Sequence, residues 1–290
     1  MYEPRWEWPA TADEVQAILT SAGGEARLIA GGTDLAVLIK NGQVRPRVLV
    51  DLGRVERLSF VDAGSGEARA AIGSTATHAQ VVADHTLRAR ATALAEACGS
   101  VGSRQIRARG TIGGNLANAS PAADSAVALL ALDAAVHVRS GAPMRGRSVR
   151  VPLECFFEGP GRTVLGHADL ITAVSFDLPE VNARSTYLKV GQRNALAIAI
   201  ASAAVVFEPS AGRIRIALGS VAPTPVRARA AERLFEAEWR RAGDRGALID
   251  DVAAAAEDAA APIDDVRAGA WYRTDLVRTL TRRALIKVCH

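Results

Sequence analysis

Two glycine-rich segments carry the residues best suited to holding a charged ligand. Residues 28–35 read LIAGGTDL and residues 109–115 read RGTIGGN. Glycine lets the backbone approach a ligand closely, and the free N–H groups of a turn that leads into a helix can hold an anion such as phosphate. Two such loops in one chain fit a ligand whose pyrophosphate is held from two sides. Neither loop has the spacing of a dinucleotide fingerprint or a Walker A loop, and a simple turn remains the alternative for the first.

Neutral polar residues and one acid accompany the second loop. Thr111, Asn115 and Ser120 offer hydrogen-bonding groups that suit a polyol. Asp124 follows them and could accept hydrogen bonds from ligand hydroxyls. The alternative role for Asp124 is a charge that complements the N-terminal dipole of a helix.

The sequence does not indicate a disulfide framework, a metal site or a nucleophilic catalytic centre. The three cysteines, Cys98, Cys155 and Cys289, are far apart and form no CxxC, which argues against a disulfide framework or a four-cysteine metal site and favours a reducing compartment. The five histidines are scattered, with no pair at metal-ligand spacing. No Ser–His–Asp or Cys–His arrangement is evident. We therefore expect no metal site and no catalytic residue of the chain's own.

Composition and charge restrict the class of protein further. The chain has 290 residues, is 49% hydrophobic and carries a net charge of +4, which fits one large or two smaller folded domains. Arginines are spread among 31 acids and aromatic residues make up only 4%, so nucleic-acid binding is not expected. The N-terminus lacks a signal-peptide pattern, and the longest apolar run, 195–207, is too short to span a bilayer. We expect a soluble, cytoplasmic protein.

The elements around the first loop form a small βαβ unit. A capping box at 11–14 predicts a helix to about residue 22. A strand at 27–30, the glycine turn, a short helix at 35–40 and a strand at 47–51 follow. This order implies parallel strand pairing.

The second loop belongs to a longer block. Ser120-Pro121 predicts the start of a helix that runs to about residue 132. Further strands are expected at 68–72, 135–139, 148–151 and 170–178, and helices at about 77–80 and 92–97.

The remaining residues predict an α+β domain with strands first and helices after them. The expected strands are 186–190, 203–207 and 213–218, and the expected helices are 226–235, about 246–260 and 273–288. The best linker lies at 179–185. We thus expect a domain at 1–179, with subdomains of about 1–55 and 56–179, and a second domain at 184–290.

Five segments resemble the FAD-binding subunit of the molybdenum hydroxylases, the family of xanthine dehydrogenase and of the medium subunit of aerobic carbon monoxide dehydrogenase. The similarity runs nearly end to end. The segments are AGGTDL at 30–35, VGSRQIRARGTIGGNLANASPAAD at 101–124, VPLECFFEGPGRT at 151–163, YLKVGQRNALAIA at 187–199 and ALGSVAPTPVRA at 217–228. The resemblance implies an α+β fold in which two N-terminal subdomains hold FAD, followed by a C-terminal α+β domain with a three-stranded antiparallel sheet and helices.

The resemblance also implies a set of FAD contacts. Asp124 would bind ribityl or adenosine hydroxyls, Ile171 would contact the isoalloxazine through its main chain, and Lys189 would be a basic contact. Val101 stands where some members carry an aromatic residue that stacks on the flavin. Two loops would hold the pyrophosphate, with Ser120 beside them: Leu28, Ile29, Ala30, Gly31, Gly32, Thr33, Asp34 and Leu35 in the first, and Thr111, Ile112, Gly113, Gly114 and Asn115 in the second.

The function implied by the resemblance is that of a flavoprotein subunit in a heteromeric oxidoreductase. Substrate would be oxidised on a molybdopterin-binding large subunit. Electrons would pass through [2Fe–2S] clusters of a small subunit to FAD on this chain, and from there to NAD or another acceptor. The alternatives are a free-standing FAD-dependent oxidoreductase and a flavin-empty scaffold subunit.

Overall fold

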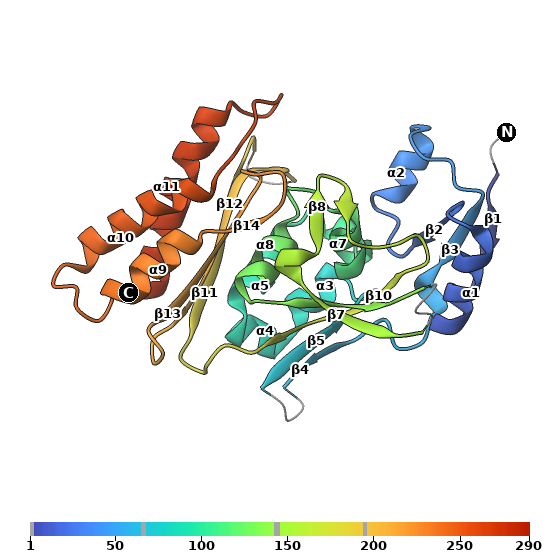
Figure 1. The fold of residues 1–290 in the computed structure, drawn as a ribbon, viewed down its shortest axis with the longest axis horizontal. Coiled ribbons are helices and arrows are strands. Elements are labelled where there is room, and N and C mark those ends of the chain that lie inside the picture. The colour runs from blue at the N-terminus through green and yellow to red at the C-terminus, as the bar shows by residue number, and fades with distance from the viewer. Residues whose placement is uncertain (1–2, 65–67, 142–145, 194–195) are drawn as a thin grey trace.

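The chain forms an elongated molecule in which three sheets follow one another along the long axis (Figure 1). The computed structural model describes residues 3–64, 68–141, 146–193 and 196–290. The N-terminal strands lie at one end, the helices of the last third lie at the other, and the largest block of helices lies between them (Figure 1).

The first sheet contains the predicted βαβ unit. Its strands are all parallel, in the order β1-β3-β2, and Leu28 pairs with Val50. Helix α1 begins after Thr11, whose hydroxyl accepts the Glu14 N–H, and ends at Gly23 in the left-handed conformation. The elements are β1 (Arg5–Glu7), α1 (Ala12–Ala22), β2 (Ala26–Ile29), α2 (Leu35–Lys40) and β3 (Val48–Asp51).

The second sheet is antiparallel, in the order β4-β5-β10-β6-β7. Its strands are β4 (Val61–Ala63), β5 (Arg69–Gly73), β6 (Ala135–Arg139), β7 (Ser148–Pro152) and β10 (Leu170–Asp177), and a small hairpin of β8 (Phe157–Gly159) and β9 (Arg162–Thr163) follows β7. The accompanying helices are α3 (His78–Ala83), α4 (His85–Arg90), α5 (Thr92–Ser100), α6 (Arg104–Arg109), α7 (Ile112–Asn118) and α8 (Asp124–Ala131).

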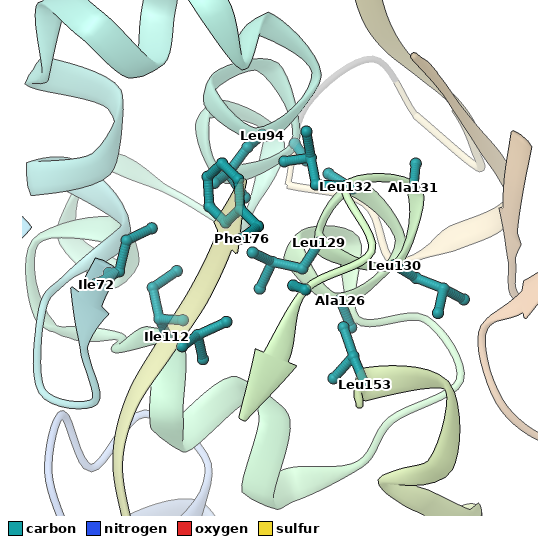
Figure 2. Close-up of a cluster of buried hydrophobic side chains, with 14 of the residues drawn as sticks. Ile72, Leu94, Ile112, Ala126, Leu129, Leu130, Ala131, Leu132, Leu153 and Phe176 are labelled. Atoms are coloured by element: carbon teal, nitrogen blue, oxygen red, sulfur yellow. The ribbon is translucent and has the colours of Figure 1, made fainter. Parts of the chain in front are cut away.

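One apolar core joins these helices to the second sheet. Figure 2 shows Phe176 of β10 among side chains of α5, α7 and α8, including Leu94, Ile112 and Leu129. These four side chains are fully buried. Burial of a residue of this kind contributes about 1.5–3 kcal/mol, so this core fixes α7 and α8 relative to the sheet.

The third sheet corrects the expected count of three strands. It has four, in the order β11-β12-β13-β14, and neighbouring strands are antiparallel. The additional strand is Val226–Arg227, which pairs with Leu218 and Ala217 before the helix expected from 226 begins at Arg229. The elements are β11 (Arg184–Gly191), β12 (Ala199–Glu208), β13 (Arg213–Gly219), β14 (Val226–Arg227), α9 (Arg229–Glu238), α10 (Arg245–Ala255) and α11 (Ala270–Cys289).

The helix predicted from Ser120-Pro121 begins later than expected. Helix α8 starts at Asp124, because residues 120–123 form a separate turn. The Ser120 hydroxyl accepts the Ala122 N–H, and the Pro121 carbonyl accepts the Ser220 N–H from the end of β13. A tertiary hydrogen bond thus occupies the carbonyl that the first helical turn would have used.

Two short helices that were not predicted, α6 and α7, lie directly before and within the second glycine-rich segment and its continuation. Glycine disfavours helices, so local preference alone hides them. Each has a side-chain cap, from Ser103 and Thr111 respectively. No helix among the described residues is long and apolar enough to cross a membrane.

Candidate FAD site

The two glycine loops meet in the folded chain. A Cβ on Gly31 would lie 2.0 Å from the carbonyl oxygen of Arg109, so only glycine permits this approach. The Asn118 amide donates to Asp34 Oδ1 across the same junction, over 3.4 Å. Loops that are about 80 residues apart in sequence therefore form one surface.

The first loop offers free hydrogen-bond donors. Among the described residues, no backbone or side-chain acceptor receives the N–H groups of Gly31, Gly32, Thr33 and Asp34. Gly32 has a φ of +73°, a left-handed conformation that glycine adopts without strain. Successive free N–H groups at such a turn make an anion-binding concavity.

The second loop differs, because its donors are already used within the chain. The N–H groups of Ile112, Gly113 and Gly114 bond to Ala76 O at 2.9 Å, Ser74 O at 2.8 Å and Thr111 Oγ1 at 3.1 Å. A Cβ on Gly113 would lie 2.7 Å from Ser74 O. This loop is therefore a fixed wall beside the first loop rather than a second row of free donors.

A small cavity connects both loops to the second sheet. It is lined by Leu28 and Ala30 at the end of β2, by Gly113 and Gly114, and by Ile171 of β10. Three of the segments predicted to contact FAD thus share one hollow. Asn115 lies behind this wall, where its side-chain oxygen accepts the Ser125 hydroxyl at 2.7 Å and ties α7 to α8.

Asp124 is a buried acid with two firm partners. It is 7% exposed, the Tyr187 hydroxyl donates to its Oδ1 over 2.5 Å, and the Lys189 ammonium donates to its Oδ2 over 2.7 Å. Burial raises the pKa of the Asp124 carboxyl, and the nearby Lys189 charge opposes that rise. Because Asp124 is also the first residue of α8, it faces the helix dipole as well.

Lys189 is held on several sides, which differs from an ordinary solvent-exposed strand residue. Its ammonium also donates to Ser100 O at 2.8 Å and to Ala197 O at 3.2 Å, and its side chain is 16% exposed. It lines a hollow together with Ser100, Arg107 and Arg193. Lys189 is therefore a positioned cation at the mouth of a second cavity.

Two predicted residues occupy different surroundings. Val101 directly follows α5 and is half-buried, and its carbonyl accepts the Arg107 guanidinium at 3.0 Å. Ser120 lines a separate hollow with Pro160 and Ser220, away from the cavity of the glycine loops. The structure thus places parts of both loops and Ile171 at one cavity, Lys189 with its partner Asp124 at a second, and Ser120 at a third.

Tyr187 was not among the residues predicted for the site, yet it bonds to Asp124. Tyr187 precedes Lys189 by two residues on β11, so both side chains point to one face. Burial, aided by the Asp124 charge, raises the pKa of the Tyr187 hydroxyl well above its usual value, which keeps it a donor. The period of two along this strand was the signal that could have identified it. In the described part of the chain, no group of three metal-ligating side chains gathers.

Comparisons with known proteins agree with these features. Residues 2–179 match the family model described as the FAD binding domain in molybdopterin dehydrogenase, and residues 186–288 match that of the CO dehydrogenase flavoprotein C-terminal domain. The chain is 31% identical to a xanthine dehydrogenase FAD-binding subunit of Escherichia coli O157:H7, with 90% of this chain and 88% of the relative covered.

Relatives and solved structures from carbon monoxide dehydrogenase cover almost the whole chain. The medium chain from Hydrogenophaga pseudoflava is 31% identical, over 98% of this chain and 97% of the relative. A solved structure of that organism's carbon monoxide dehydrogenase superposes with a TM-score of 0.91 at 28% identity, covering 99% of this chain and 97% of that one. Quinoline 2-oxidoreductase from Pseudomonas putida 86 gives a TM-score of 0.86 at 26% identity, covering 99% and 96%.

The fold and the paired loops thus define an oxidoreductase flavoprotein subunit with a two-domain FAD-binding architecture. The chain belongs to the family of FAD-binding medium subunits of the molybdenum hydroxylases, and its cofactor is FAD.

Proposed function

We propose that this chain holds one FAD and passes electrons from the [2Fe–2S] clusters of a small partner subunit to NAD or another acceptor. A molybdopterin-binding large subunit would oxidise the substrate. The observation that carries the proposal is the row of free N–H groups at residues 31–34, which packs against the second loop at Arg109 and Gly110 in a chain whose family binds FAD. FAD supplies the redox chemistry, and the chain supplies binding and orientation.

The residue assignments within this proposal follow from the two cavities. The free donors of residues 31–34 would hold the pyrophosphate, and Gly113 and Gly114 would line the adjoining cavity with Leu28 and Ala30. Ile171 offers its main chain at the same cavity. Asp124 and Lys189 hold hydroxyls and the flavin end of the cofactor, with Val101 beside them.

The two proposed domains, 1–179 and 184–290, contribute different residues to the proposed site. The first carries both loops and Asp124, and the second brings Lys189 to Asp124 on the same face of β11 as Tyr187. Lys189 and Asp124 thus join the two domains at the FAD site. The chain closes the flavin end of this site only when both domains are folded together.

Helix α6 is our proposal for part of the partner-facing surface. None of its residues is buried, it carries three arginines at 104, 107 and 109, and it leads directly into the second loop. A basic surface next to the cofactor site steers a partner with acidic residues toward the flavin.

Co-expression with its neighbouring genes tests the proposed function. The chain should co-elute with an iron–sulfur subunit and a molybdopterin subunit, and dithionite-reduced clusters should transfer electrons to FAD within that complex. Elution of the chain alone, with flavin that a small substrate reduces directly, would favour a free-standing flavoenzyme. Co-elution without any flavin would favour a scaffold.

A further inference from the structure

The open edge of the third sheet carries a seam that the proposed function does not explain. Strand β11 is one of the two edge strands of this sheet, and within the described residues it pairs with β12 on one side only. Helix α5 lies along the other side. Exposed strand edges are usually blocked by a covering element, and here that element leads straight into Val101.

Alternate residues of β11 bond to successive turns of α5. The Ser185 hydroxyl accepts the Ala93 N–H at 3.0 Å and caps the helix start, where the helix has no cap of its own. At the other end, the Lys189 ammonium donates to Ser100 O, which suits the negative end of the helix dipole. Side chains on one face of a strand recur every two residues, a spacing close to the rise of one helical turn. Residues 185, 187 and 189 can therefore contact successive turns of α5.

Glu96 occupies the middle of this seam. Its Oε2 accepts the Tyr187 N–H at 2.7 Å and the Thr186 hydroxyl at 2.8 Å. Its Oε1 accepts the Lys287 ammonium at 2.8 Å, which adds the end of α11 to the contact. One carboxylate thus satisfies an edge-strand N–H, a buried hydroxyl and a cation.

We infer that Glu96 is a positioning residue for the FAD site, acting through Tyr187 on the pair of Asp124 and Lys189. Glu96 fixes the backbone of Tyr187, and the hydroxyl of the same residue donates to Asp124. Within the described part of the chain, Glu96 forms no hydrogen bond or ion pair with Asp124 or Lys189, so its effect must pass through β11. This inference rests on the proposed assignment of Asp124 and Lys189 to FAD.

Two variants of Glu96 in the full-length chain distinguish the effect of side-chain length on FAD binding from the effect of the carboxylate charge. Glu96→Asp keeps the charge but shortens the side chain by one methylene, so the carboxylate withdraws from the Tyr187 N–H. Glu96→Gln keeps the reach and an acceptor oxygen but loses the charge opposite Lys287. We expect Glu96→Asp to weaken FAD binding about tenfold, and Glu96→Gln to stay within about threefold of the wild type, because an unpaired buried donor costs more than a partly exposed ion pair.

Lys287→Met is the matched control. Within the described residues, the Lys287 ammonium contacts only Glu96 and Thr186, and its side chain is 53% exposed. We expect this variant to change FAD affinity less than about threefold. A larger loss in Lys287→Met or Glu96→Gln than in Glu96→Asp would assign the effect to the surface ion pair and overturn the inference.

A double-mutant cycle with Tyr187→Phe measures whether the effects of the two substitutions on FAD affinity are coupled. A purely structural role of Glu96 would give no such coupling. If Glu96 acts through Tyr187, the Glu96→Asp effect on FAD affinity should disappear once the Tyr187 hydroxyl is gone. Additive losses would contradict the inference. Should Glu96→Asp fail to fold, Ser185→Ala, at the far end of the seam, enters the same cycle with the same two outcomes.

The cycle also distinguishes this inference from the site assignment. If Asp124→Ala and Tyr187→Phe weaken FAD binding but Glu96→Asp does not, only the role of Glu96 is wrong. If none of the three changes FAD affinity, the assignment of Asp124 to the cofactor fails as well.

Discussion

For Asp124 the sequence offered two alternative roles, a polar contact in the site and a charge at a helix N-terminus, and its position in the structure is compatible with both. It lies at the first position of α8, where a negative charge complements the helix dipole, and it also pairs with Lys189 and Tyr187. Removing one partner of a buried ion pair leaves an uncompensated charge, which costs far more than a dipole interaction. Its stabilising role is therefore larger than a capping charge alone would give.

Asp124→Ala should destabilise the FAD-free chain by about 3–5 kcal/mol, because Lys189 loses its buried counter-charge. It should also weaken FAD binding by about 1–3 kcal/mol, because ligand hydroxyls lose an acceptor. Denaturant unfolding and FAD titration measure the two effects. The control is Asp124→Ala with Lys189→Met, which should recover part of the stability but not the affinity. A loss of stability of about 1 kcal/mol or less with unchanged affinity would leave Asp124 as a helix-dipole residue only.

The glycines of the two loops differ in what a methyl group would meet. A Cβ on Gly31 would strike the Arg109 backbone, and one on Gly114 would lie 2.8 Å from Thr111 Oγ1, the cap of α7. Around Gly32 the nearest atom would be the Ile29 side chain at 3.4 Å, so only its positive φ resists substitution.

Gly32→Ala is therefore the variant that separates binding from folding. It should cost about 1 kcal/mol of stability from the left-handed conformation and should abolish FAD binding, because the methyl group lies among the free donors of the loop. Gly31→Ala is the comparison and should destabilise the FAD-free chain more. Circular dichroism melting and flavin content after reconstitution measure both. Wild-type flavin content in Gly32→Ala would mean that this loop does not hold the cofactor.

At the scale of elements, a buried histidine at the start of α3 lies beside the second loop. His78 begins α3, its N–H donates to Gly110 O, and it is 2% exposed. Burial, assisted by the Arg107 charge, lowers the pKa of His78 from 6.5 to about 4. The unfolded chain therefore binds a proton near pH 6.5 that the folded chain resists until about pH 4.

This difference makes folding stability depend on pH. Because the folded pKa is the lower one, the stabilisation is present above pH 6.5 and is lost as pH falls toward 4. Between pH 7 and pH 5 the contribution of His78 should fall by about 2 kcal/mol. His78→Gln should remove that part of the pH dependence in urea unfolding. Equal pH slopes for the wild type and the variant would show that His78 does not titrate in this way.

Local patterns predicted the elements that depend on local signals. The capping hydroxyl of Thr11, the glycine turn and the apolar runs of β2 and β3 were sufficient for the βαβ unit. The start of α8 could not be predicted in this way, because Ser220 takes the Pro121 carbonyl from about 100 residues away. Strand β14 also depends on a distant partner, since its two residues are extended only by pairing with β13.

Local residue patterns and the family resemblance led to different parts of the proposed site. Glycine-rich composition pointed to the loops around Gly32 and Gly113, neighbouring polar residues pointed to Asp124, and the family resemblance added Lys189. Two backbone N–H groups of the second loop donate to the carbonyls of Ser74 and Ala76. These hydrogen bonds depend on the tertiary structure and could not be predicted from the sequence alone. Tyr187 was missed because a tyrosine in a strand usually reads as core.

At the scale of the whole molecule, the proposed FAD site lies where separate parts of an elongated chain meet. The first glycine loop follows β2 of the first sheet, the second lies where α6 meets α7, and Lys189 comes from β11 of the third sheet (Figure 1). No part holds all of the proposed contacts. Under the proposed function, electron transfer through this subunit should require the complete chain, and loss of FAD should interrupt that path without removing the partners.

The most direct test of the central claim compares the co-expressed wild-type complex with a complex that carries Gly32→Ala. Both are reduced anaerobically with dithionite, and the reoxidation of the [2Fe–2S] clusters by NAD⁺ or a water-soluble quinone is followed by absorbance. We predict rapid reoxidation by at least one of these acceptors in the wild-type complex. In the FAD-free variant the clusters should stay reduced although all three subunits co-elute. Equally fast cluster reoxidation without FAD would show that electrons leave the complex by another route and would contradict the account.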